Sequence, residues 1–285
     1  MLTGVKQHTI RIWEQRYNVP QPKRTATNIR YYTDSDLKLL LNIATLNRIG
    51  HKISKIACLK ESEIEQLVLS HIEESNSTLL QLESLLNALM QMDEVAFEKI
   101  LEKNISETGV EETMTQLVFP FLQRVGMMWQ TSCVCPAFEH FLSNLIRQKI
   151  IAATDSLPKK ISAQAKKFIL FLPQGEPHEL GLLYANYLVR ARGHQSIYLG
   201  QNLPLECLHT AHNSFQPDFI VSVVTTPVKL KDVQAFVKRV STGFPKCKIL
   251  LSGMQLFNKS IQLPQNVLVM ENFEKFVQLI SRAEK

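Results

Sequence analysis

Residues 168–181 read FILFLPQGEPHELG, and this stretch decides the fold of the C-terminal part of the chain. The apolar run Phe168–Leu172 is followed by a polar loop and then by a pattern with helical character. Strand, loop and helix in this order are typical of a parallel sheet with helical crossovers, whose ligands bind in the loops at the carboxyl ends of the strands. The polar loop is therefore the first place to look for a site.

The same alternation continues to the end of the chain. Short apolar runs predict strands over 168–172, 196–199, 219–224, 249–252 and 267–270. Helices are expected over 179–192, 204–215, 229–242 and 272–283. This order predicts a doubly wound, flavodoxin-like α/β domain over residues 163–285.

Residues 75–157 contain few Gly or Pro and show helical periodicity. Five leucines are spaced for one helix face, namely Leu79, Leu82, Leu85, Leu86 and Leu89. Further helices are expected over 93–103, 109–130 and 136–155, which together predict a four-helix bundle followed by a linker at 158–167.

The N-terminal segment, residues 1–72, is basic. Residues 1–60 carry 11 Lys or Arg and 3 Asp or Glu, whereas the whole chain has a net charge of +6. Residues 1–60 therefore have a net charge of about +8, and the remaining residues have a net charge of about −2. This distribution indicates nucleic acid or an anionic surface as the partner of the N-terminal segment. A solvated basic face is the alternative.

The local pattern of this segment predicts a helix, a Pro-broken turn and a small hairpin. The helix covers Thr9–Tyr17, and the hairpin covers 23–32 with Asn28 at its turn, because Asn tolerates a positive φ. Thr33 and Asp36 are capping residues before the next helix. Two more helices are expected over 52–57 and 61–73.

Composition excludes several classes of protein. The chain has no apolar run long enough to span a membrane, and its first residues lack the apolar core of a signal peptide. Five dispersed cysteines do not suggest a disulfide framework, so a cytoplasmic location is expected. No nucleotide-binding glycine loop or Ser-His-Asp arrangement is visible.

The basic head resembles the winged helix-turn-helix of MerR-family regulators. The resemblance is carried by HTIRIWEQR at 8–16, PKR at 22–24, NIRYY at 28–32 and DL at 36–37. It implies that a helix enters the major groove of operator DNA while wing cations grip phosphates. The implied contacts are His8 and Thr9 near base edges, with Arg11, Arg16, Arg24, Arg30 and Tyr32 elsewhere. An acid partner for Arg16 and a core position for Tyr32 are the alternatives.

Two features of the head depart from that family. The family usually begins with one more helix before its Thr-Gly-Val turn, whereas here Met1-Leu2 directly precedes Thr3-Gly4-Val5, so the first helix is expected to be missing. Asn28 stands where the family commonly has Gly, which is expected to cost little.

The C-terminal domain resembles a cobalamin-binding domain. That family's pattern is Asp-x-His-x-x-Gly, then Ser-x-Leu, then Gly-Gly, and here it reads Glu176-x-His178-x-x-Gly181, then Ser222-x-Val224, then Gly253-Met254. The resemblance implies that His178 ligates cobalt, since neutral imidazole suits that metal. Glu176 would bond the other ring nitrogen.

Small residues complete this pattern. Gly181 would let the corrin edge approach, and Ser222 with Gly253 would open a slot for the nucleotide tail. Met254 would narrow that slot. The alternative for His178 is a polar loop histidine.

The helical segment carries a further motif, Trp129 followed by Glu139-His140. Pro136 suits the first turn of a helix, which would bring the three residues to one mouth of the bundle. This resembles the cap of the adenosylcobalamin-dependent photoreceptor repressors of carotenoid genes, and it implies contacts with the upper face of the cofactor. Gln130 stands where some of those photoreceptors have a cobalt-capturing His. A core Trp with a Glu-His pair is the alternative.

Together these patterns predict a multi-domain, non-enzymatic transcription regulator. It would bind double-stranded operator DNA as a homo-oligomer, a dimer or tetramer, under control of adenosylcobalamin or methylcobalamin, and it would respond to light. Two alternatives remain: a cofactor-free regulator that uses the fold for oligomerisation, and a corrinoid carrier of an enzyme system.

Overall fold

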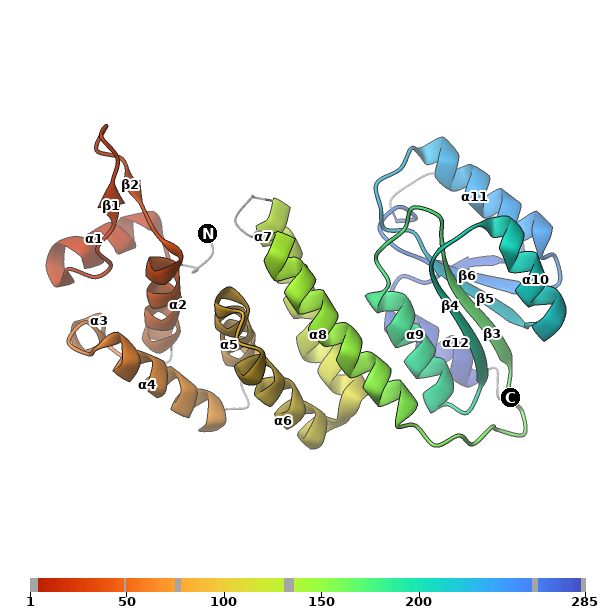
Figure 1. Ribbon diagram of the computed structural model, residues 1–285, viewed down its shortest axis with the longest axis horizontal. Helices are drawn as coiled ribbons and strands as arrows, with labels where there is room; N and C mark the ends of the chain where they lie inside the picture. Colours follow the sequence, from red (N-terminus) through yellow and green to blue (C-terminus); the bar gives the residue numbers. More distant parts are fainter. Residues whose placement is uncertain (1–4, 49, 75–77, 131–135, 258–260, 283–285) are drawn as a thin grey trace. The chain divides into compact units, whose positions relative to one another are not determined.

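The computed structural model describes residues 5–48, 50–74, 78–130, 136–257 and 261–282. The chain divides into two compact units, residues 1–142 and 143–285, which are described separately (Figure 1). Within the described residues, no helix combines the length and the apolar character that a membrane crossing requires.

The first unit begins with the expected order of elements. Helix α1 (Gln7–Tyr17) precedes an antiparallel hairpin of β1 (Lys23–Arg24) and β2 (Arg30–Tyr31). Helices α2 (Asp34–Arg48), α3 (Ile53–Ile56) and α4 (Glu61–Glu74) follow. The expected positive φ at Asn28 is confirmed at 63°.

The start of α2 is capped as its sequence predicts. The Thr33 hydroxyl donates to Asp36 Oδ2 at 2.7 Å, and the Asp36 amide donates back to Thr33 Oγ1 at 3.3 Å. Such reciprocal bonds satisfy amides that a helix leaves without partners. The buried core of this part consists of Trp13, Leu40, Ile43, Leu46, Ile56, Ile64 and Val68.

Helices cover the segment that was predicted to be helical. They are α5 (Thr78–Gln91), α6 (Glu94–Thr113), the π-helical turn η1 (Met114–Val118), α7 (Phe119–Gln130) and α8 (Pro136–Asp155). Gly109 has a φ of 85° and interrupts α6, close to the predicted helix boundary. The prediction of a buried Leu79 is wrong, because this residue lies in the first turn of α5 and is 58% exposed, whereas Leu85, Leu86 and Leu89 are buried.

The second unit contains a parallel five-stranded sheet in the order β4-β3-β5-β6-β7. Its strands are β3 (Lys167–Pro173), β4 (Gln195–Leu203), β5 (Phe219–Val223), β6 (Lys248–Ser252) and β7 (Val267–Val269). The helices between and after them are α9 (Leu180–Ala191), α10 (Leu205–Phe215), α11 (Leu230–Gly243) and α12 (Phe273–Arg282). This is the strand order of the flavodoxin type, and it confirms the predicted fold.

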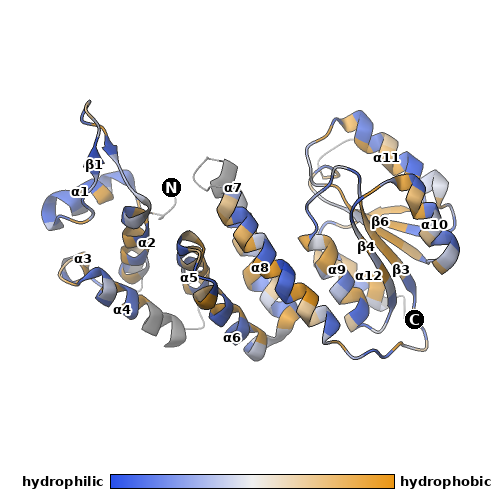
Figure 2. Ribbon diagram, in the orientation of Figure 1, coloured by the Kyte–Doolittle hydropathy of each residue, from blue (hydrophilic) through white to orange (hydrophobic). Residues whose placement is uncertain are grey.

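Both faces of this sheet are covered. Helices α10 and α11 pack on one face through Leu208, Val233, Val237 and Val240, and α9 and α12 lie on the other (Figure 1). Figure 2 shows the central strands of the sheet mostly in the hydrophobic colour and the surrounding helices in alternating colours. Burial on both sides explains why the β3 sequence is a continuous apolar run and does not alternate. The chain leaves β3 and β5 in opposite directions, and sheets of this type bind ligands beside the carboxyl ends of such strands.

Candidate cofactor site and DNA-binding surface

The loop after β3 holds Glu176 and His178 in direct contact. The His178 ring nitrogen Nδ1 lies 2.6 Å from Glu176 Oε1, and the His178 amide donates to the same oxygen at 3.1 Å. Glu176 is only 3% exposed, whereas the His178 side chain is 55% exposed. A buried carboxylate therefore fixes an imidazole that reaches outwards.

A second strand end completes the surroundings of Glu176. The amides of Thr225 and Thr226, just after β5, donate to Glu176 Oε2 at 2.6 and 2.7 Å, and the Thr226 hydroxyl donates to Oε1 at 3.0 Å. Burial alone would raise the pKa of Glu176. The bonds from His178, Thr226 and Thr225 outweigh it and lower the pKa to about 2.

This network determines which nitrogen of His178 is available to a metal. An ionised carboxylate can only accept hydrogen bonds, so Nδ1 of His178 carries the proton. Nε2 is then the nitrogen with the lone pair that a metal requires. The loop thus has the arrangement in which a carboxylate orients a histidine ligand.

Ser222 and Gly253 lie at the next strand ends, and Ser222 is the one whose surroundings fit a bound group. Ser222 is fully buried, and its hydroxyl has no hydrogen-bond partner among the residues that the structure describes. Buried polar atoms are usually satisfied, so an unpaired one is consistent with a ligand. Gly253 has a φ of 110°, and a Cβ there would lie 2.3 Å from the Val224 carbonyl oxygen. The backbone of Val224 therefore packs against Gly253, and the slot for the nucleotide tail stays a prediction.

A third group of residues around the loop was not predicted. Glu179 accepts a bond from Arg147 Nε on α8 at 2.6 Å and one from the Tyr198 hydroxyl on β4 at 2.9 Å. Burial and the bond to Glu179 raise the pKa of Tyr198 well above its ordinary range.

Gly181, a predicted residue of the site, lies in the first turn of α9, where a Cβ would meet only Phe273, at 3.9 Å. Packing within the described chain therefore does not require glycine at 181.

The missed residues differ in how visible they were. Thr225 and Thr226 directly follow the Ser222-x-Val224 motif, so their place at the same sheet edge as Glu176 was readable from the strand pattern. Arg147 and Tyr198 carry no local signal, because each reaches Glu179 only through the tertiary fold.

We expect acid to remove a part of the stability that depends on Glu176. Its folded pKa lies below the ordinary 4.5, so its contribution is complete above that pH and is lost as the pH falls towards 2. The shift corresponds to about 3 kcal/mol. In the cofactor-free protein, the destabilisation caused by Glu176→Gln should therefore shrink by about that amount between pH 7 and about pH 2.5, as measured by urea unfolding.

Glu206→Gln is the matched control for this experiment. Glu206 also has a lowered pKa, but it pairs with Arg239 on the surface, where both side chains are exposed. Exposed ion pairs contribute little, so the control should show little dependence on pH. An effect of Glu176→Gln that is equal at both pH values would contradict the assignment.

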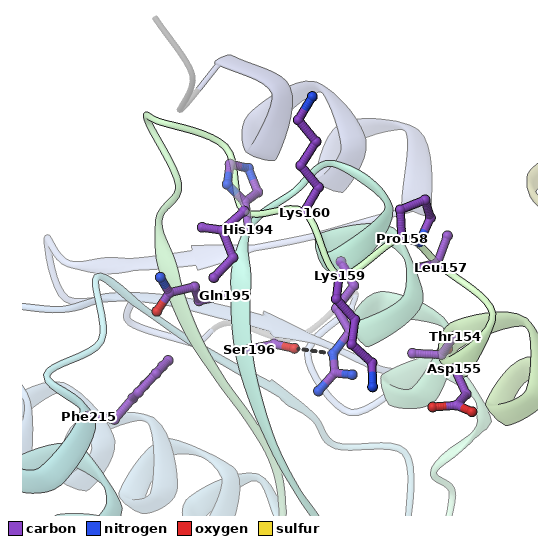
Figure 3. A pocket seen from close by; sticks show the side chains of 12 residues that line it. Thr154, Asp155, Leu157, Pro158, Lys159, Lys160, His194, Gln195, Ser196 and Phe215 are labelled. Atoms are coloured by element: carbon purple, nitrogen blue, oxygen red, sulfur yellow. Dashed lines mark hydrogen bonds between the residues drawn. The ribbon is translucent and has the colours of Figure 1, made fainter.

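A cavity of about 320 Å³ lies at the opposite edge of the sheet (Figure 3). Its lining includes Lys159, Lys160, Ser196 and Phe215, and it reaches the start of β4, not the carboxyl ends of the strands. His194 in its wall has both ring nitrogens engaged, Nδ1 with the Lys166 amide and Nε2 with the Ile280 carbonyl. This histidine therefore holds three chain segments together, and the cavity is separate from the His178 site.

The cap motif is only partly described. Trp129 is the penultimate residue of α7, and its side chain, like that of Gln130, lies outside the described residues. Helix α8 begins at Pro136 as predicted, and Glu139 and His140 lie in its first two turns. His140 Nδ1 is 3.6 Å from Glu139 Oε2, and the side chains are 74% and 47% exposed.

The residues predicted to contact DNA lie on α1 and the hairpin. On α1, His8, Arg11 and Arg16 are exposed and Thr9 is half-buried. On the hairpin, Tyr32 is 38% exposed, so the alternative of a core position does not hold. Arg24 and Arg30 both pair with Glu14 of α1, at 3.2 and 2.7 Å. The helix and the hairpin therefore present cations together, and the contact with DNA remains a prediction.

Comparison with known families identifies the basic head and the helical segment. Residues 1–63 match the family described as MerR HTH family regulatory protein, and residues 81–153 match the B12 binding domain family. The chain is therefore a transcriptional regulator with a MerR-type helix-turn-helix and a B12-binding region, and cobalamin is its cofactor.

Particular relatives narrow this class. The chain is 27% identical over 252 residues to the HTH-type transcriptional repressor CarH of Myxococcus xanthus, which covers 86% of this chain and 83% of CarH. It is 28% identical over 223 residues to the HTH-type transcriptional repressor CarA of the same organism, covering 77% of this chain and 72% of CarA. Both relatives are repressors, which agrees with a regulator and not an enzyme.

A solved structure shares the fold. The monomethylamine corrinoid protein of Methanosarcina barkeri superposes with a TM-score of 0.58 at 14% identity, over 71% of this chain and 98% of that protein. The likeness supports the parallel α/β architecture.

Proposed function

We propose that His178 is the cobalt ligand of this regulator and that bound cobalamin controls its oligomeric state. The observation that carries the proposal is the Glu176–His178 pair beyond the carboxyl end of β3, supported by the Ser222 hydroxyl on the neighbouring strand, which has no partner among the described residues. Glu176 holds the proton on Nδ1, which places the lone pair of the imidazole on Nε2, and Gly181 adds no side chain to the loop. The protein would act in the cytoplasm.

Assembly of identical chains would connect the cofactor to DNA. In a dimer or tetramer, two heads act on one operator, and the second binding event occurs at a high effective concentration. A change in oligomeric state therefore changes occupancy without altering any contact of the head with DNA.

The predicted cap residues Trp129, Glu139 and His140 suggest how light would change the oligomeric state. When bound, adenosylcobalamin supplies a cobalt–carbon bond that light cleaves. We infer that Trp129, Glu139 and His140 contact its upper face, so they lose a partner once the adenosyl group departs. These contacts control assembly only if their free energy differs between the two oligomeric states. The difference must be a few kcal/mol, which is typical of coupled sites. Gln130 offers no imidazole to hold the cobalt afterwards.

The proposal is tested with the full chain loaded with adenosylcobalamin. We expect a larger oligomer and tighter DNA binding in the dark than after green light, measured by light scattering and fluorescence anisotropy. The protein loaded with a cobalamin that lacks the adenosyl group should behave like the illuminated sample. Equal size and DNA affinity in all three samples would contradict control by light. Equal values without any cobalamin as well would favour a regulator that works without the cofactor.

A further inference from the structure

We propose that Glu14 is a positioning residue for the β1–β2 hairpin, which is called the wing below. It holds the side chains of Arg24 and Arg30 in the orientation in which they contact DNA. This inference rests on the proposed DNA contacts of the head. It assigns a role to Glu14, whose acidic side chain lies on the DNA-facing side of the head, where cationic side chains are expected.

The short strands of the wing contribute little to its stability. Strands β1 and β2 have two residues each, and isolated two-stranded hairpins are marginally stable. Their register also places Arg24 directly opposite Arg30. Like charges at directly opposed positions destabilise a ladder. Something outside the hairpin must therefore counter this repulsion.

Glu14 supplies the missing charge from helix α1. Its Oε1 accepts from Arg24 Nη2 at 3.2 Å, and its Oε2 accepts from Arg30 Nε at 2.7 Å. The Glu14 side chain is 15% exposed, so the carboxylate lies largely covered between the two cations. One carboxylate thus joins the helix to both strands of the wing.

The same chain of bonds reaches the tip of the wing. Arg24 Nη1 donates to Asn28 Oδ1 at 2.8 Å, and Asn28 is the positive-φ residue of the turn. The order Glu14, Arg24, Asn28 therefore connects the helix with the turn through side chains alone. The wing orientation depends on Glu14 at its root.

The bonds from Arg24 and Arg30 to Glu14 leave donors of the wing that can bind a DNA phosphate. A guanidinium has five N–H donors, and Glu14 occupies only the Nε donor of Arg30. Within the described part of the chain, the terminal nitrogens of Arg30 have no hydrogen-bond partner. The bonds from Arg30 and Arg24 also lower the pKa of Glu14, which keeps it ionised at neutral pH.

An electrostatic effect and a positioning effect would change the DNA affinity of Glu14→Gln in opposite directions. Loss of a negative charge from a DNA-facing surface should tighten binding, because DNA is polyanionic. Loss of these bonds should weaken binding, because glutamine offers one acceptor oxygen to two arginines and leaves them opposed. The sign of the change therefore separates the two explanations.

The test uses the full chain and a fluorescein-labelled, random-sequence DNA duplex, titrated at several salt concentrations. We expect Glu14→Gln to bind roughly fivefold more weakly. Its salt slope should fall by about 0.9 for each wing phosphate contact that is lost. Combined with Arg30→Ala, it should cost less than the sum of the single changes. Glu14→Asp, which keeps the charge on a shorter side chain, should lie between wild type and Glu14→Gln.

Glu65→Gln is the matched control, because Glu65 pairs with Lys38 in the same head and does not touch the wing. It should bind DNA as tightly as wild type or slightly more tightly. If Glu14→Gln behaves like this control while its circular dichroism and melting temperature are unchanged, the positioning role is overturned. If the wild type itself does not bind the duplex, the DNA function fails, and the role of Glu14 fails with it.

Discussion

Gly253→Ala is expected to destabilise the α/β unit by about 4 kcal/mol, which combines backbone strain with overpacking. The residue has a φ of 110°, and the new Cβ would lie 2.3 Å from the Val224 carbonyl oxygen and 2.6 Å from its carbon. Val224 cannot move aside easily, because its amide donates to Ser252 and its carbonyl accepts from Gln255. Amide exchange of β5 and β6 would report the loss.

Gly175→Ala is the control that separates strain from packing. Gly175 also has a positive φ, 84°, but a Cβ there would have no atom within 4 Å. It should therefore cost about 1 kcal/mol, from backbone strain alone. Equal losses for the two variants would show that contact with Val224 is not what requires glycine at 253.

The strands and their parallel connections could be predicted, because burial on both faces of a sheet shows in the local sequence. Continuous apolar runs such as Phe168–Leu172 identify strands that are covered on both faces, and the helices between them require parallel connections. Helix ends were also readable where a cap is local, as at Thr33 and Asp36. Helix faces were less secure at their ends, as the exposed Leu79 shows.

The candidate site was predictable only where its partners lie close in sequence. Glu176 and His178 are two residues apart, and their bond follows from the loop itself. The bonds from Thr225 and Thr226 need the pairing of β3 with β5. The role of Gly253 needs the path of the backbone at Val224, which no pattern of residue types records.

The wing shows the same limit in the first unit. Arg24 and Arg30 were correctly recognised as cations of the hairpin. Their shared partner Glu14 lies 10 and 16 residues away, on a different element. A charge count treats the three residues as separate, whereas the fold makes them one unit.

His178→Ala is expected to abolish nitrogen coordination of cobalt while leaving the fold intact. The side chain is more than half exposed, so the free energy of unfolding of the cofactor-free protein should change by less than about 1 kcal/mol. Glu176 keeps the amides of Thr225 and Thr226, so it remains satisfied when the imidazole is removed. The visible spectrum of bound cobalamin should shift to that of a form without a histidine ligand.

Two comparisons make this result specific to the Glu176–His178 pair. Glu176→Gln keeps the imidazole but removes its anionic partner, which typically weakens metal binding by about 10- to 100-fold, so it should retain the coordinated spectrum at higher cobalamin concentration. His212→Ala removes a histidine on α10 that contacts Phe244, far along the sequence from the loop, and should leave the spectrum unchanged. If His178→Ala also leaves it unchanged, Glu176 orients His178 for some purpose other than holding cobalt. The buried carboxylate, with its pKa of about 2, would then serve mainly to join the ends of β3 and β5.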